Sequence, residues 1–122
     1  MTAKYQVACC LMHNRNEAVY DDFLEDMVKD MEECVAIARA AGVPDDKIML
    51  DPGVGFGKTY EMNLEAINHV DILHRLGFPI LLGTSRKSVI GNTLNLPADQ
   101  RVEGTLATTV IGVMKGCSFV RV

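Results

Sequence analysis

Four short apolar segments, separated by longer amphipathic ones, constrain the fold of this chain more than any other feature. The apolar segments cover residues 6–12, 48–50, 79–82 and 118–122, and each is too short for a helix. Such nearly continuous apolar runs are typical of parallel strands covered on both faces. The segments at about 19–41, 60–76 and 98–115 carry apolar residues at steps of three and four, which predicts helices. This alternation predicts an α/β fold with a parallel sheet.

Glycines and a proline predict where these elements end. Gly42, Gly77 and Gly116 follow the three amphipathic segments, where a left-handed residue commonly ends a helix. A short turn of helix is expected near residues 84–88, followed by a break between Asn92 and Pro97.

The length of the chain limits how much of such a fold it can contain. Both the doubly wound sheet and the (β/α)8 barrel use this order of elements, and a closed barrel usually needs about 250 residues. The chain has 122 residues and ends on a strand that no helix follows. We therefore expect it to be one part of a larger α/β domain.

Composition and charge exclude several classes of protein. Hydrophobic residues make up 48% of the chain and charged residues 23%, which argues against disorder and coiled coils. The net charge of −4 argues against general binding of nucleic acid or anionic membranes. No apolar stretch approaches the roughly 20 residues of a membrane span, so we expect a cytoplasmic protein. The cysteines lack C-x-x-C spacing and are expected to be buried, reduced thiols; they are Cys9, Cys10, Cys34 and Cys117.

Polar side chains gather at the carboxyl end of every predicted strand. They are His13, Asn14 and Arg15, then Asp51, then Ser85, Arg86 and Lys87, and finally Arg121. In both parallel architectures the loops at these ends converge and bind ligands. Cations at a helix start, as expected for Arg86 and Lys87, oppose the helix dipole unless an anion binds there. The pattern therefore predicts a local anion site, and the alternative is a solvated basic turn.

Three of the candidate residues keep two interpretations open. Asp51 either forms a turn or accepts two hydrogen bonds from an amidine-like edge, such as that of a 2-aminopyrimidinone ring. Residues 53–59 do not fit a nucleotide loop, because a Walker A motif needs glycine in place of Pro52 and a Rossmann motif needs it in place of Lys58. A flexible glycine loop remains, in which Phe56 either forms the wall of a flat pocket or packs into the core. His13 is either a core residue or a ligand contact.

Several segments then resemble a known family. The sequences LMHNR at 11–15, DPGVGFGKT at 51–59, LLGTSRKSVIG at 81–91 and KGCSFVRV at 115–122 closely resemble dihydropteroate synthase. The resemblance implies a partial pterin-binding domain over residues 1–122, the carboxyl-terminal half of a TIM (β/α)8 barrel with about four strands and three main helices. The parent enzyme would be a transferase of folate biosynthesis and a sulfonamide target, and a homodimer in its full length. It would condense p-aminobenzoate with 6-hydroxymethyl-7,8-dihydropterin pyrophosphate.

The resemblance also implies roles for individual residues. The pterin would be bound by Asp51, Lys87, Arg121 and Met12. The p-aminobenzoate would be bound by Phe56, Ser85, Arg86 and Lys87. Arg121 and Ser88 would hold the pyrophosphate, and Lys87 and Arg121 would be catalytic. In the family mechanism pyrophosphate leaves first, and the amine then attacks a pterin cation.

Other parts of the family pattern are missing from this sequence. They are the asparagine that binds Mg²⁺ with the pyrophosphate, an aspartate and an asparagine for the pterin, two mobile loops, and a histidine two residues beyond Arg121. We therefore expect the chain alone to be inactive. Alternatives are the pterin-binding half of a methyltetrahydrofolate methyltransferase and a non-catalytic, anion-binding half-barrel module. The Ser-Arg-Lys-Ser segment at 85–88 argues against the methyltransferase.

Overall fold

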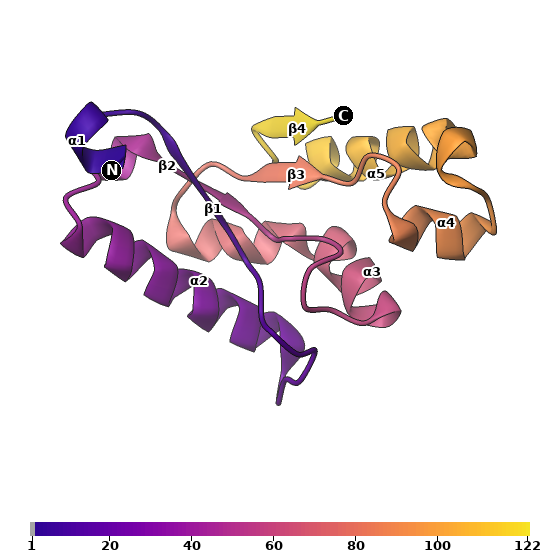
Figure 1. Cartoon of the computed structure of the whole chain (residues 1–122), viewed down its shortest axis with the longest axis horizontal. Helices are drawn as coiled ribbons and strands as arrows, with labels where there is room; N and C mark the ends of the chain where they lie inside the picture. Colours follow the sequence, from indigo (N-terminus) through magenta and orange to yellow (C-terminus); the bar gives the residue numbers. More distant parts are fainter. Residues whose placement is uncertain (1) are drawn as a thin grey trace.

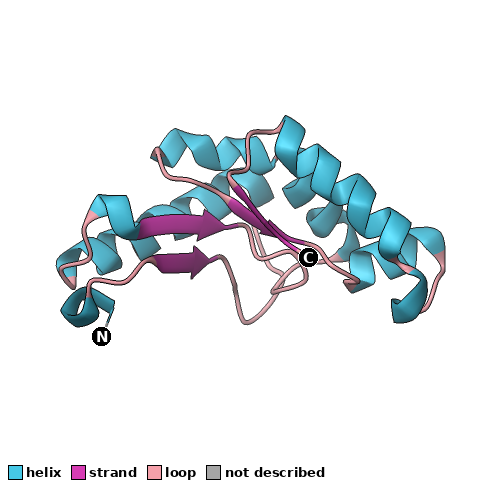
Figure 2. Cartoon of the chain, turned by 90° about the horizontal axis from the view of Figure 1, so that it is seen from above, coloured by secondary structure: helices cyan, strands magenta, loops and turns pink. Residues whose placement is uncertain are grey.

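The computed structural model describes residues 2–122 and contains four short parallel strands in chain order. They are β1 (Cys9–Met12), β2 (Ile48–Asp51), β3 (Leu81–Gly83) and β4 (Phe119–Arg121). β1 pairs with β2 and β3 with β4, and a bridge between Leu50 and Ile80 joins the two pairs. The pairs β1-β2 and β3-β4, joined by this bridge, confirm the predicted parallel α/β layout, and Figure 2 shows the strands as two pairs.

The first long helix, α2 (Phe23–Ala40), begins four residues later than the sequence predicts. Asp22 caps it by accepting a hydrogen bond from the backbone N–H of Glu25, so the preceding residues stay in a loop. Gly42, with φ 90°, follows its end as predicted. In Figure 1, α2 lies below the strands.

The second and third predicted helices are each interrupted. The second consists of α3 (Tyr60–Asn68) and the 3-10 helix η2 (Val70–Leu76), because His69 leaves the helical conformation with φ −118° and ψ 29°. The third consists of the 3-10 helix η3 (Ala98–Gln100) and α5 (Val102–Met114), separated by Arg101. Gly77 and Gly116 follow these helices with positive φ, as predicted.

The short helical turn predicted at 84–88 lies further along the chain. It is α4 (Ser88–Leu94), which ends at Asn95 in the left-handed region. The predicted break at Asn92 therefore begins too early. Two further short elements, α1 (Thr2–Tyr5) and the 3-10 helix η1 (Asp45–Lys47), were not predicted.

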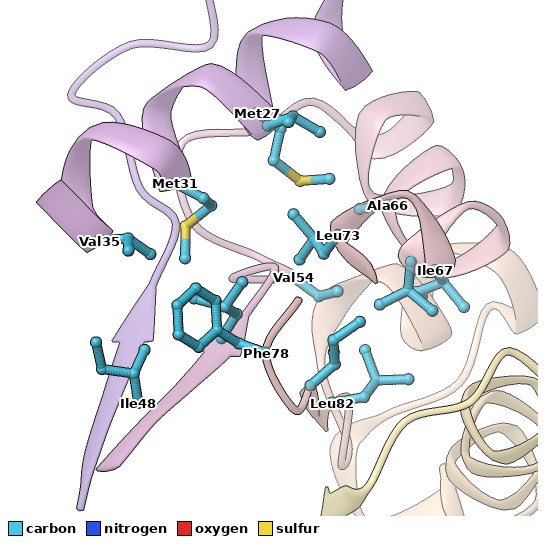
Figure 3. Packing of buried hydrophobic residues seen from close by; sticks show 14 of the residues in the cluster. Met27, Met31, Val35, Ile48, Val54, Ala66, Ile67, Leu73, Phe78 and Leu82 are labelled. Carbon is cyan, nitrogen blue, oxygen red and sulfur yellow. The ribbon is translucent and has the colours of Figure 1, made fainter. Parts of the chain in front are cut away.

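One hydrophobic core lies between the strands and the helices (Figure 3). Met27 and Met31 of α2, Leu50 of β2, Leu73 of η2 and Ile80 before β3 are completely buried. Full burial of one such side chain contributes about 1.5–3 kcal/mol. This packing fixes the positions of the strand ends, which carry the polar residues.

The end of the described chain is much less covered than the core. All residues of β4 are exposed, and so is an apolar stripe along α5, formed by Val102, Leu106, Val110 and Val113. The prediction of buried cysteines is wrong for Cys10, whose side chain is exposed in β1, while the other three thiols are partly buried. All four are free thiols. Among residues 2–122, no helix is long and apolar enough to cross a membrane.

Candidate active site at the strand ends

The strand register places the predicted site residues at one edge of the sheet. Met12 lies opposite Asp51 at the ends of β1 and β2, and Gly83 lies opposite Arg121 at the ends of β3 and β4. The charges of Asp51 and Arg121 both act on the ammonium of Lys87. Burial lowers the pKa of its ammonium, Asp51 opposes that shift, and Arg121 adds to it. The predicted convergence is therefore confirmed for Asp51, Lys87 and Arg121. It is wrong for His13 and Arg15, which bind Asp30 of α2 instead.

Asp51 is buried, and one of its oxygens forms a turn. Its Oδ1 accepts a hydrogen bond of 2.8 Å from the backbone N–H of Gly53. Gly53 has φ 68°, and a side chain there would collide with the His13 carbonyl, so the turn requires glycine. Within residues 2–122 no hydrogen bond reaches Oδ2 of Asp51. The carboxylate thus fixes the loop with one oxygen, and its second oxygen has no hydrogen-bond partner among these residues.

The glycine loop that follows is held on both sides, in contrast to the predicted flexible loop. The backbone N–H of Gly55 donates to Oδ1 of Asn63 at 2.7 Å. The hydroxyl of Tyr20 donates to the carbonyl of Gly57, also at 2.7 Å. Asn63 and Tyr20 were not predicted as supporting residues, because nothing in the sequence pairs them with this loop.

Phe56 lies on the surface of this loop with 41% of its area exposed, so the interpretation of Phe56 as a core residue is wrong. Lys87 Nζ lies 5.3 Å from the centre of its ring, in a cation–π arrangement. The same ammonium donates a hydrogen bond of 2.6 Å to the carbonyl of Val54. Lys87 therefore connects the loop after β3 to the loop after β2.

The loop after β3 is shaped by residues of α5 and its N-terminal flank. Arg86 adopts φ 53°, a conformation that non-glycine residues rarely take. Its N–H donates to Thr105 Oγ1 at 3.1 Å, and its carbonyl accepts from Arg101 Nη1 at 2.8 Å. Thr84 and Thr108 share a hydroxyl hydrogen bond of 2.6 Å. These contacts hold the backbone of residues 84–87 in place.

The side chains of this loop correct one prediction. Arg86 and Lys87 precede α4 instead of lying inside its first turn, and Lys87 occupies the N-cap position. Ser88 is the first residue of α4 and is exposed, as is the Arg86 side chain, while Ser85 is half-buried. The Arg86 guanidinium is not directed into the core.

Arg121 extends over the backbone of β3. A Cβ atom on Gly83 would lie 3.1 Å from Nη2 of Arg121 and 3.3 Å from Nε, so glycine makes room for the guanidinium. Arg121 is exposed, and among the ion pairs of residues 2–122 it has no carboxylate partner. A guanidinium in this position can bind an anion.

His13 does not face an open site, because only 1% of its surface is exposed. Its Nε2 lies 2.9 Å from Oδ2 of Asp30, and its Nδ1 lies 2.8 Å from Nζ of Lys58. Arg15 binds Asp30 with two hydrogen bonds of 2.6 and 2.9 Å. The interpretation of His13 as a buried structural residue is therefore confirmed. Asp30 and Lys58 were not predicted as its partners.

A family model described as "Pterin binding enzyme" matches residues 1–122. The chain belongs to this family. It is 61% identical over 123 residues to a dihydropteroate synthase of Clostridium beijerinckii and 51% identical over 122 residues to one of Bacillus subtilis. All of the chain is aligned in both cases, but only 46% and 43% of the two relatives. The chain thus spans about half the length of these relatives.

Solved structures give the same assignment. A dihydropteroate synthase of Clostridium difficile, solved in the presence of pteroic acid, has a TM-score of 0.95 and 46% identity. One from Xanthomonas albilineans with 4-aminobenzoic acid has a TM-score of 0.93 and 33% identity. Each match covers 98% of this chain, and 46% and 45% of the respective structures. The resemblance to dihydropteroate synthase is confirmed, and the chain is an α/β fragment of the TIM-barrel type.

Proposed function

We propose that the complete protein is a dihydropteroate synthase and that this chain forms the carboxyl-terminal half of its (β/α)8 barrel. The observation that carries the proposal is the meeting of Asp51, Lys87 and Arg121 at one edge of the sheet, with Phe56 beside them. Two parallel strand pairs, joined in chain order by the bridge between Leu50 and Ile80, support this arrangement, because consecutive barrel strands lie side by side.

The pterin would bind between Asp51, Lys87, Arg121 and Met12. Asp51 Oδ2 is free of hydrogen bonds within residues 2–122 and would accept from the 2-amino group and N3–H of the ring. Lys87 and Arg121 would lie against the ring. The relative solved in the presence of pteroic acid supports a pterin as the ligand class.

The p-aminobenzoate would bind beside the pterin, against Phe56, Ser85, Arg86 and Lys87. The exposed Phe56 ring offers a flat apolar wall, and the half-buried Ser85 lies on the neighbouring loop. The relative solved with 4-aminobenzoic acid supports this substrate class. Compounds that share its shape, such as sulfonamides, would compete for the same wall.

The reaction needs a group that binds the departing pyrophosphate. Arg121, which lacks a carboxylate partner in the described part of the chain, would hold it together with the Ser88 hydroxyl. Oriented cationic donors stabilise a leaving anion in this way. Within residues 2–122 no group of three or more metal-binding side chains could hold Mg²⁺. Ligands for that ion would have to come from the rest of the protein.

The assembly of the complete protein follows from an exposed apolar surface. We expect a homodimer, in which the stripe of Val102, Leu106, Val110 and Val113 on α5 is covered. We expect the complete enzyme in the cytoplasm.

The proposal is tested by joining residues 1–122 to the amino-terminal part of the Clostridium beijerinckii relative, in place of the equivalent 46% of that protein. The joined protein should form dihydropteroate and release pyrophosphate only when both p-aminobenzoate and the pterin pyrophosphate are present. Pterin binding without any dependence on p-aminobenzoate would favour a methyltransferase instead. Binding of pyrophosphate alone would favour the non-catalytic module.

A further inference from the structure

Four polar side chains form a continuous network beside the glycine loop. Lys58 Nζ lies 2.8 Å from His13 Nδ1, and His13 Nε2 lies 2.9 Å from Asp30 Oδ2. Arg15 then binds both oxygens of Asp30, at 2.6 and 2.9 Å. The network joins the loop after β2, the loop after β1 and the helix α2.

Lys58 uses all its donors inside the protein. Besides His13 Nδ1, its ammonium donates to the carbonyl of Gly53 at 3.0 Å and to that of Phe56 at 2.9 Å. An ammonium has three N–H donors, so none is left for a ligand. The two carbonyls lie at the start of the glycine loop and at its aromatic residue. Since the Gly53 N–H also binds Asp51, one lysine supports both site residues.

The hydrogen bonds of the network have only one possible direction. Protonated Lys58 can only donate, so His13 Nδ1 must accept, and the ring proton lies on Nε2, from which it is donated to Asp30. Burial lowers the pKa of His13, and the positive charge of Lys58 lowers it further, which keeps the ring neutral. Arg15 lowers the pKa of Asp30 and keeps it ionised. Each member of the network thus fixes the protonation state of its neighbour.

We propose that Lys58 is a positioning residue that holds the Gly53 and Phe56 carbonyls, anchored through His13 and Asp30, and so fixes the aromatic wall of the amine-substrate site. The role rests on the proposed synthase function. Lys58 would touch neither substrate, so its loss should raise the KM for p-aminobenzoate and leave kcat nearly unchanged.

The charge of Lys58 offers a readout that a merely structural residue would lack. Burial lowers its pKa to about 8. The charged groups around it come from four segments: Asp51 of β2 and Asp30 of α2 favour the ammonium, Lys87 before α4 disfavours it, and His13 after β1 is neutral. A neutral amine has two N–H donors for three acceptors. Deprotonation should therefore break one of the three contacts that anchor the loop.

The test measures KM and kcat of the joined protein described above between about pH 6.5 and 9.5. In the parent, the KM for p-aminobenzoate should rise about fivefold as the pH passes 8, the effect expected for one lost hydrogen bond. Lys58→Met should raise this KM by about tenfold at pH 7 and remove the rise near pH 8. Lys29→Met, on the exposed face of α2, is the matched control and should behave as the parent. If Lys58→Met keeps the parental KM, or keeps the alkaline rise, the proposal is wrong.

A second variant covers the case in which Lys58→Met folds poorly. Lys58→Arg keeps a positive charge and several donors at every pH used. Its KM for p-aminobenzoate should show no rise near pH 8. If this KM rises near pH 8 as it does in the parent, the proposal is wrong.

Histidine NMR of the same joined protein separates this proposal from the enzymatic one. In Lys58→Met, His13 loses its partner at Nδ1 and a neighbouring positive charge, so its pKa should rise. An unchanged His13 signal would overturn the network itself. If the signal responds but the protein forms no dihydropteroate, the synthase assignment fails while the anchoring of the loop is supported.

Discussion

Lys87 Nζ lies 5.3 Å from the centre of the Phe56 ring, and this contact joins the loops that follow two neighbouring strands. The same ammonium donates to the Val54 carbonyl, so Lys87 contacts both the ring and the backbone of the loop after β2. An exposed cation–π contact contributes only about 0.5–1 kcal/mol. The contact places the Phe56 ring beside an ammonium on which the charge of Asp51 also acts.

This contact predicts a selective effect of replacing the ring. Phe56→Leu in the joined protein should raise the KM for p-aminobenzoate several-fold, because a flat wall is lost, and should leave the KM for the pterin pyrophosphate within about twofold. Leu64→Ala, at an exposed position of α3, serves as the control. Equal changes in both KM values would show that Phe56 does not distinguish the two substrates.

Substitution of Gly83 is predicted to weaken pyrophosphate binding as substitution of Arg121 does, although glycine has no side chain. Gly83→Ala would place a methyl group 3.1 Å from the guanidinium of Arg121 and displace it. Calorimetric titration should show weaker pyrophosphate binding for Gly83→Ala and for Arg121→Lys, which lacks the planar fork. Arg75→Lys, which pairs with Glu25 on the surface, should bind as the parent does. If Arg121→Lys binds pyrophosphate as tightly as the parent does, Arg121 has a structural role and does not bind the anion.

The stability of the protein should fall with acid in two steps. The pKa of His13 is lowered in the folded state, so the unfolded chain binds more protons and stability falls as the pH drops below 6.5. The pKa of Asp30 is also lowered, so its contribution is lost as the pH falls below 3.8. Urea unfolding of the joined protein at several pH values measures both. His13→Gln should remove the first step, and His69→Gln, at an exposed position, should keep it.

The 122-residue chain by itself is predicted to associate. β4 exposes its whole length and α5 exposes an apolar stripe, and uncovered strand edges pair with other copies. Sedimentation of the isolated chain should show oligomers that increase with concentration, or a broad thermal transition. A monomer with a sharp, concentration-independent transition would contradict this view.

The order of elements and the position of the candidate site at the strand ends were predictable from the sequence, because both follow from local patterns. Apolar periodicity marks the strands and helices, and parallel strands bring their carboxyl ends together. The breaks at His69 and Arg101 were not predictable, since neither position carries glycine or proline. The network of Lys58, His13 and Asp30 joins residues 17 and 45 positions apart, and only the packing of α2 against β1 places them together.

The most direct test of the account is the activity of Asp51→Asn in the joined protein. Asparagine keeps an oxygen that can accept from the Gly53 N–H, so the turn should survive while the charge that would bind the pterin is lost. We predict that kcat/KM for the pterin pyrophosphate falls by about a hundredfold. Asp46→Asn, on the exposed η1 helix, should keep parental activity. Near-parental kcat/KM for Asp51→Asn would contradict the assignment of this site.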